Sequence, residues 1–546
     1  MCLDTLHLMK LMYSKFVSLP RFNVITVILA ALIIYNIFLG INYINYVFND
    51  EDAMRNYLIS HHIVKYAESP NLGPSSSVVR EFTSTLPFYL FSSVLIIHDS
   101  VYTLQWLQII LKVITLISLY LIAKDLFSRS TGLITVILFT FSHQILQLQT
   151  YEFWEPGIMT SFLYFSVFLL VRSLISRNYL LLVAGCFFYI ASFAIHLSAL
   201  GVLPFIAILS FFSIKKMKLT PKYVIFLVEF VFVITLVFYF TTIIHFLQNQ
   251  MNLLTPFTSK GNTSISLIKY HFNGSLISLS QALGFTSNKT FYPLANLALI
   301  IIVIGSIGYF LYSWISKDKK IYLSLILGII ASYLLFSSFI STGHGFWYLA
   351  PVFGLCLIYL AEIINTITSK KVLGPFLGIP IVLIFVIILS QDMNNFSFGQ
   401  RIFEKHNILS LAALAIEGEL HHIQKKDNIE NLNFFQIKSL NEYNDDGSKF
   451  HDTNAGLWNI LEKDLDTKFT TIYDSRGYQD HDTKRGAGFI SINKLTYIFL
   501  VCDRQWLKDT SFEGCKEKFN KYYPGYVFAN LVYSRDSYRV YSMKKV

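Results

Sequence analysis

The sequence predicts a polytopic α-helical membrane protein with a separate α/β domain at its C-terminal end. Composition is the first reason: 54% of the 546 residues are hydrophobic and 14% are charged, whereas soluble domains carry about 25% charged residues. Mean hydropathy is also positive, at +0.50. Finally, apolar runs long enough to cross a bilayer, about twenty residues each, recur as far as residue 390. These observations exclude a soluble globular enzyme, a disordered protein and a secreted disulfide scaffold.

Each long apolar run predicts one membrane helix, so we expect about eleven helices. The first run follows a basic leader and is long enough to span the bilayer, so we interpret it as a retained signal anchor. A shorter run at 85–98 is ambiguous by length alone. The predicted spans are residues 22–44, 102–123, 131–149, 157–176, 178–195, 198–214, 222–244, 293–315, 321–340, 347–367 and 372–390.

Basic clusters set the expected topology. The net charge is +10, and membrane proteins concentrate lysine and arginine in cytoplasmic loops, so we expect no nucleic-acid partner. All clusters fall in the cytoplasm only if 85–98 is a juxtamembrane or re-entrant helix that does not cross. The N-terminus is then cytoplasmic. Residue usage rich in Ile, Lys, Asn and Phe indicates an AT-rich genome, and we expect a bacterial inner membrane rather than an endoplasmic reticulum. The clusters are Lys10/Lys15/Arg21, Lys124/Arg129, Arg172/Arg177, Lys215/Lys216/Lys218/Lys222, Lys317/Lys319/Lys320 and Lys370/Lys371.

Two domains follow from this topology. Residues 1–390 form the transmembrane domain, whose first outer loop at 45–101 carries juxtamembrane helices. Residues 391–546 form an extracytoplasmic, or periplasmic, α/β domain. Its Cys502 and Cys515 lie close together in a normally oxidising compartment; we expect a disulfide, and the alternative is two unpaired thiols. The domain has one helix-like stretch, Ile402–Ile423, and three strand-like ones, Tyr497–Val501, Tyr526–Val532 and Tyr538–Ser542.

Three consecutive acids follow the first predicted helix, in the segment Asp50-Glu51-Asp52. This position is the outer surface of the membrane. A carboxylate there can serve as general base for an acceptor hydroxyl. The alternative is a solvated helix cap, because Asp is a good N-cap residue and acids favour a first helical turn.

Four motifs occur in a fixed order along the chain. They are Asp50-Glu51, Leu86-Pro87-Phe88-Tyr89, the stretch from Ala123 to Phe127, and Tyr348-Leu349-Ala350-Pro351. With this set the sequence resembles the GT-C superfamily of glycosyltransferases, in the branch of protein O-mannosyltransferases and the lipid A aminoarabinose transferase. The resemblance covers roughly residues 22–390. It implies a polyprenyl-phosphate-linked sugar donor and transfer of a hexosyl or pentosyl group to a protein, lipid or glycan acceptor outside the membrane.

The resemblance also implies roles for particular residues. Asp50 is the expected catalytic carboxylate, which deprotonates or orients the acceptor, and Glu51 supports it or binds the acceptor. Family members carry an acid in the second short outer loop, matched here by Glu152 or Glu155. No cofactor and no metal are expected, because the phosphate-ester donor requires none.

The donor phosphate needs a cation or several hydrogen-bond donors. The aminoarabinose branch has a Glu-Lys pair before its prolines, whereas this chain has Arg80-Glu81 further upstream and no lysine there. The candidates are Arg55, Arg80, His344 and Tyr348. Arg80 could instead be a surface charge, and His344 an interfacial residue within an aromatic belt.

Two charges fall inside predicted spans, at Lys112 and Glu229. Charges within a bilayer are costly and are usually paired or functional. Lys112 is expected to face the donor cavity or to pair with Glu229; the alternative is that the span boundary is drawn wrongly and the charge lies outside the membrane. The adjacent pair His61-His62 is not expected to chelate a metal by itself.

The leading hypothesis is an integral-membrane glycosyltransferase with an Asp as general base. The alternative is a polytopic transporter or flippase of envelope lipids or glycans, and a third class is a non-catalytic scaffold for envelope assembly. Transporters tend to place polar residues and broken helices at the bilayer midplane. The acids of this chain instead concentrate at the outer surface.

Overall fold

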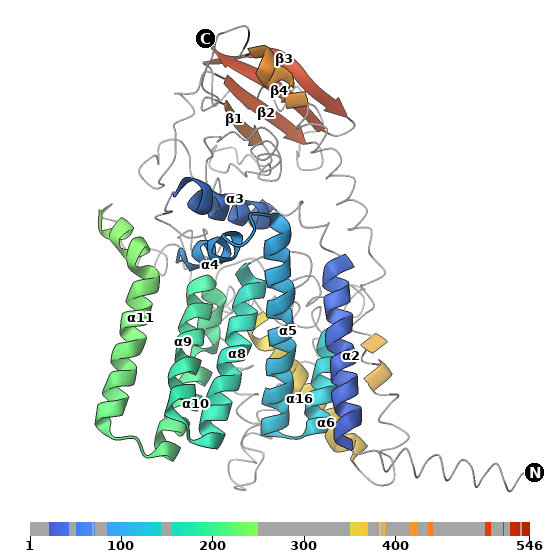
Figure 1. Ribbon diagram of the computed structural model, residues 1–546, viewed down its shortest axis with the longest axis vertical. Coiled ribbons are helices and arrows are strands. Elements are labelled where there is room, and N and C mark those ends of the chain that lie inside the picture. Colours follow the sequence, from blue (N-terminus) through green and yellow to red (C-terminus); the bar gives the residue numbers. More distant parts are fainter. Residues whose placement is uncertain are drawn as a thin grey trace, which may run out of the picture.

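A computed structural model shows a bundle of long helices, two shorter helices across one end of it, and a C-terminal sheet (Figure 1). The described residues are 21–42, 51–67, 70, 84–142, 155–248, 350–369, 380, 382–384, 386–387, 415–416, 418–423, 425, 435–439, 497–503, 517, 525–535 and 538–546.

The bundle consists of apolar helices. Among the residues that the structure describes, five segments are long and apolar enough to cross a membrane, namely α2, α5, α8, η3 with α10, and α11, as expected of a multi-pass membrane protein. The bundle helices are α2 (Arg21–Asn42), α5 (Val101–Leu126), α6 (Arg129–Thr140), α8 (Glu155–Ser176), α9 (Tyr179–Ile195), the short 3-10 helix η3 (Leu197–Val202), α10 (Leu203–Met217), α11 (Pro221–Gln248) and α16 (Ala350–Thr368).

Helices α3 (Glu51–Tyr66) and α4 (Leu86–Leu95) lie across one end of the bundle, which we call the α3 end (Figure 1). Helix α4 has ten residues, about half the length that spans a bilayer. Pro87 occupies its first turn, where the missing N–H removes no helical hydrogen bond.

The apolar runs predicted most of these helices to within a few residues. The run at 102–123 is α5, and the run at 222–244 is α11. The prediction of one helix over 131–149 was wrong, because α6 ends at Thr140 and Ser142 is already non-helical. That run contains Ser142, His143 and Gln144, whose polar groups interrupt it. The predicted helices at 293–315 and 321–340 lie outside the described residues, and 372–390 is described only in part.

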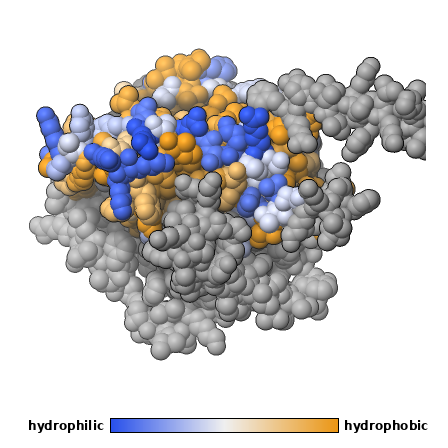
Figure 2. Space-filling view, turned by 90° about the horizontal axis from the view of Figure 1, so that it is seen from below, coloured by the Kyte–Doolittle hydropathy of each residue, from blue (hydrophilic) through white to orange (hydrophobic). Residues whose placement is uncertain are grey.

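Short turns connect α5 to α6, α8 to α9 and α10 to α11. Short connections make neighbouring helices antiparallel. Helix α5 begins at the α3 end and runs to the opposite end of the bundle, where all three turns lie (Figure 1). We call this opposite end the basic end. Arg172 donates to Asp125 there, with Nη1 and Oδ2 3.2 Å apart. Hydrophilic residues gather on this end (Figure 2). Three of the predicted basic clusters, between Lys124 and Lys222, lie at these three turns. Arg21, from a fourth predicted cluster, is the first residue of α2.

Helix α8 lies between α5 and α9 and packs closely on both. Ser166 donates to the carbonyl of Gly185 at 2.7 Å. A Cβ added at Gly185 would come within 2.7 Å of Leu170. Small residues that let backbones approach are typical of helix interfaces in membranes.

The C-terminal strands form a mixed four-stranded sheet in the order β1-β2-β4-β3. Strand β1 is parallel to β2, and β4 is antiparallel to both β2 and β3. Asn530 and Ser542 donate to the Glu419 carboxylate at 2.7 and 3.1 Å, which packs the helical residues 418–423 on the sheet. The three strand-like stretches of the sequence are strands here. The bounds are β1 (Phe435–Ser439), β2 (Tyr497–Asp503), β3 (Tyr526–Arg535) and β4 (Tyr538–Lys545).

Candidate active site

The acidic segment immediately precedes and begins α3. The helix starts at Glu51, so Asp50 lies one residue before it and just outside the described residues. Positions 51 and 55 are one helical turn apart and share a face of α3. The structure describes the backbone at both positions, and it thus places Glu51 and Arg55 in the first turns of a helix at the α3 end. The helix-cap interpretation and the catalytic one are compatible with this placement.

Serine side chains join α3 to α4. Ser60 donates to the carbonyl of Phe88 at 3.1 Å. Ser92 donates to the carbonyl of Ser60 at 3.2 Å and to that of Phe88 at 2.6 Å. Ser60 and Ser92 are buried, so these hydrogen bonds are shielded from water and fix the contact between the two helices.

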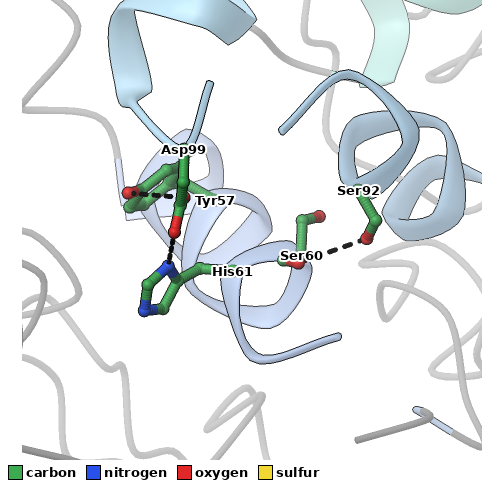
Figure 3. A network of polar contacts seen from close by, with 5 residues as sticks. All are labelled: Tyr57, Ser60, His61, Ser92 and Asp99. Atoms are coloured by element: carbon green, nitrogen blue, oxygen red, sulfur yellow. Dashed lines mark hydrogen bonds and ion pairs between the residues drawn. The ribbon is translucent and has the colours of Figure 1, made fainter. Parts of the chain in front are cut away.

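A second polar network joins α3 to the start of α5 (Figure 3). Asp99 lies in the turn between α4 and α5, next to Ser100, the N-cap of α5. Its Oδ2 is 2.5 Å from Nδ1 of His61, and its Oδ1 accepts from the hydroxyl of Tyr57 at 3.2 Å. Both carboxylate oxygens of one residue therefore contact α3.

Opposing effects act on the Asp99 carboxyl. Asp99 is on the surface, and its partial burial favours the neutral form, but the hydrogen bond and positive charge of His61, the hydrogen bond of Tyr57 and the charge of Lys65 outweigh this effect. The pKa of Asp99 is therefore lowered from its ordinary value. Asp99 is a carboxylate at neutral pH, and a carboxylate can only accept hydrogen bonds, so Nδ1 of His61 carries the proton between them.

Glu155 is the first residue of α8 and is 3% exposed. Helix α8 ends at the basic end, so Glu155 lies at the α3 end. A carboxylate is favoured electrostatically in a first helical turn. The structure thus brings one predicted secondary acid to the same end of the bundle as the acidic segment of α3.

Buried polar residues continue from the α3 end into the bundle along α5. Gln105, Gln108, Lys112 and Thr115, which we call the polar stripe, are each at most 2% exposed. Their spacing places them on one side of the helix. Thr115 donates to Ser161 of α8 at 2.8 Å, so this side is turned toward α8. Polar side chains in a membrane interior usually face the bundle and mark functional paths.

The alternative in which Lys112 pairs with Glu229 does not hold in the structure. Lys112 is buried in the polar stripe, whereas Glu229 is exposed on α11. Helix α11 packs against α9 at the edge of the bundle, away from α5 (Figure 1). The remaining interpretation is that Lys112 belongs to a polar interior.

Two groups of known proteins share this architecture. Residues 85–240 match the family model of the dolichyl-phosphate-mannose-protein mannosyltransferases. The crystal structure of ArnT from Cupriavidus metallidurans bound to undecaprenyl phosphate is similar with a TM-score of 0.58 at 9% identity, over 95% of this chain and 97% of that chain. The chain has the GT-C fold. ArnT from the same organism in the apo state gives a TM-score of 0.54, also at 9% identity and over 95% and 97% of the two chains. No curated protein sequence matches the chain.

The part matched by the family model spans α4 to most of α11. Asp99, the polar stripe and Glu155 therefore lie in the segment that carries the GT-C likeness. Several predicted site residues, namely Asp50, Arg80, Glu152, His344 and Tyr348, lie outside the described residues. Cys502 is in β2, but Cys515 is also outside them, so their disulfide stays a prediction. Within the described part of the chain, no group of three or more His, Cys, Asp or Glu could hold a metal ion.

The sequence analysis did not identify Asp99 or its contacts with His61 and Tyr57 in this GT-C bundle. Tyr57 and His61 stand four residues apart, the spacing that puts two side chains on one helical face, but Asp99 lies 38 residues further on. The polar stripe had a clearer signal. Gln105, Gln108, Lys112 and Thr115 repeat at intervals of three or four within an apolar run.

Proposed function

We propose that the protein is an integral-membrane glycosyltransferase that transfers a monosaccharide, hexosyl or pentosyl, from a polyprenyl-phosphate donor to an extracytoplasmic protein, lipid or glycan acceptor. One observation carries the proposal: the acidic segment that begins α3 and the buried Glu155 of α8 lie at the same end of a GT-C bundle. The matched family model is named for a dolichyl-phosphate-linked mannose, and the similar ArnT structure contains undecaprenyl phosphate. Dolichyl phosphate and undecaprenyl phosphate are both polyprenyl phosphates.

In this proposal Asp50 is the general base. Its carboxylate takes the proton of the acceptor nucleophile, which attacks the anomeric carbon while the bond to the phosphate oxygen breaks. Glu51 supports Asp50 or holds the acceptor, and Glu155 or Glu152 is the secondary acid. A single displacement inverts the anomeric configuration.

The leaving phosphate gains negative charge in this step and needs hydrogen-bond donors or cations. Arg55, Arg80, His344 and Tyr348 are the proposed phosphate ligands. Position 55 lies in the first turns of α3, close in sequence to the acidic segment, which supports a role for Arg55 at the same site. Deeper in the bundle than the α3 end, the polar stripe supplies buried amide groups and one buried lysine. We propose that the polar stripe lies beside the donor site.

We further propose the topology predicted from the charges. The basic end faces the cytoplasm and the α3 end faces outward, with the C-terminal α/β domain on the outer side of a bacterial inner membrane. The clustering of basic residues at the turns opposite α3 supports this orientation, because lysine and arginine concentrate in cytoplasmic loops.

The test is sugar transfer by the purified full-length protein from a panel of radiolabelled polyprenyl-phosphate monosaccharides. Transfer to an acceptor extract, or hydrolysis of a donor to free sugar, supports the proposal when Asp50→Ala abolishes it. A product with retained anomeric configuration contradicts the single displacement. Movement of labelled lipid across proteoliposomes without any transfer product would instead establish the flippase alternative.

A further inference from the structure

We infer that His61 and Asp99 are positioning residues that fix helix α3, and with it the acidic segment at its N-terminus, on the membrane bundle. This inference rests on the proposed function for its catalytic consequence. The contact itself is a structural observation: one carboxylate receives two side chains of α3, at 2.5 Å from His61 and 3.2 Å from Tyr57 (Figure 3).

The two sides of this contact differ in how firmly they are held. Asp99 directly precedes Ser100, whose side chain caps α5 by accepting from the amide of Tyr102 at 3.3 Å. Helix α5 has 26 residues and is packed in the bundle. Helix α3 has 16 residues and lies across the bundle end. Asp99 therefore lies beside the N-terminus of a helix packed in the bundle, and we infer that α3 is the element that it holds.

Two side-chain contacts attach the middle of α3 to its neighbours. The Ser60–Ser92 contact with α4 is one, and the Asp99 contact with Tyr57 and His61 is the other (Figure 3). Tyr57 and His61 also stack on each other, with ring centroids 5.8 Å apart. Without Asp99, α3 keeps its contact with α4 but loses one of the contacts that hold it, and any shift of the helix displaces the residues at its N-terminus.

The separation of His61 from the acidic segment along α3 favours a positioning role for His61 over a role in proton transfer. His61 is ten residues beyond Glu51 on α3, about 15 Å along a helix axis. This separation of the two backbone positions on α3 argues against direct proton transfer between the His61 imidazole and residue 51. A displacement of about 1 Å at reacting groups can cost on the order of 10²-fold in rate, so a shift of α3 is sufficient to lower turnover.

The test uses the geometry of the imidazole ring. The amide nitrogen of asparagine can occupy the place of Nδ1, and that of glutamine the place of Nε2. Since Asp99 contacts Nδ1, His61→Asn keeps the contact and His61→Gln loses it. We expect His61→Gln and Asp99→Asn to lower kcat about tenfold or more, with KM for the donor within twofold. We expect His61→Asn to keep kcat within about threefold, and exposed His98→Gln, beside Asp99, to match wild type.

Equal loss of kcat in His61→Asn and His61→Gln would overturn the inference, because the loss would then not depend on the contact between position 61 and Asp99. Wild-type kcat in His61→Gln would overturn it as well. A readout independent of turnover is hydrogen exchange of the α3 amides in the full-length protein. Exchange must rise in His61→Gln and Asp99→Asn but not in His61→Asn. If wild type transfers no sugar, the proposed function fails, while the exchange pattern still decides whether the contact holds α3.

Discussion

Tyr164 of α8 accepts a hydrogen bond from the backbone amide of Gly354 of α16, with its hydroxyl oxygen 2.6 Å from the nitrogen. The same hydroxyl donates to the carbonyl of Ala350 at 2.8 Å. In an unbroken α-helix the amide of residue 354 would bond that carbonyl directly. The Tyr164 hydroxyl is thus inserted into the first turn of α16, which contains Ala350 and Pro351 of the Tyr348–Pro351 motif.

This insertion needs a glycine at position 354. A Cβ there would lie 2.6 Å from Cζ of Tyr164 and 2.9 Å from a methyl carbon of Leu119. We expect Gly354→Ala to lower the free energy of unfolding by about 1–3 kcal/mol, as other overpacked cores do. The measurement is thermal unfolding in detergent. The matched control is Gly418→Ala, where a Cβ meets nothing within 4 Å; a helical glycine in open space should gain stability on this change. Equal effects at the two glycines would contradict the packing account.

A buried hydrogen bond between α2 and α6 gives a second prediction. Asn36 donates to the Thr140 hydroxyl at 3.0 Å, and Asn36 is 1% exposed. Interhelical hydrogen bonds in membrane proteins contribute about 0.6 and at most about 1.7 kcal/mol, so Thr140→Val should destabilise the protein by an amount in that range. Thr135→Val is the control, because the Thr135 hydroxyl donates within its own helix, to the carbonyl of Thr131. A Thr140→Val protein as stable as wild type would show that the bond contributes nothing.

The Asp99 network predicts a pH dependence of stability. The pKa of Asp99 is lowered in the folded protein, so the folded state binds this proton less readily than the unfolded state. The stabilisation is therefore complete at neutral pH and is lost as pH falls through the ordinary carboxyl range, about pH 4, to the lower folded value. Unfolding midpoints of wild type and Asp99→Asn should differ at pH 7 and converge in acid. A difference that stays constant with pH would exclude this carboxyl as its cause.

Glu155 gives a prediction for activity. Its carboxylate is buried at the α3 end, where the proposed reaction takes place. If it is the secondary acid, Glu155→Gln should lower kcat by about 10²-fold or more. Glu229→Gln serves as the control, since that carboxylate is exposed on α11 at the edge of the bundle. Full activity of Glu155→Gln would move the secondary role to Glu152.

The sequence predicted those parts of the fold that depend on local patterns. Apolar runs located α5, α8 and α11, because a helix that crosses lipid must satisfy its backbone internally and present apolar side chains. The same argument failed at α6, since apolarity does not fix where a helix ends. The acids of the α3 segment stood out because they directly follow an apolar run.

Contacts between distant segments could not be predicted in this way. Nothing local to His61 indicates that its partner is Asp99, and nothing local to Gly354 indicates that the Tyr164 hydroxyl enters its helical turn. Lys112 shows the intermediate case. Its place in an apolar run indicated a special environment, but only the packing of α5 on α8 decided against Glu229.

The central claim is that a carboxylate before α3 is the base in sugar transfer. The most direct measurement compares wild type, Asp50→Asn and Asp52→Asn in single-turnover transfer from a polyprenyl-phosphate sugar, at saturating donor. Asparagine keeps the size of aspartate and removes its basicity, and Asp52 is a neighbouring acid with no assigned role. We expect Asp50→Asn to lose at least about 10²-fold in rate with unchanged donor affinity, and Asp52→Asn to retain wild-type turnover. Wild-type turnover by Asp50→Asn would contradict the account.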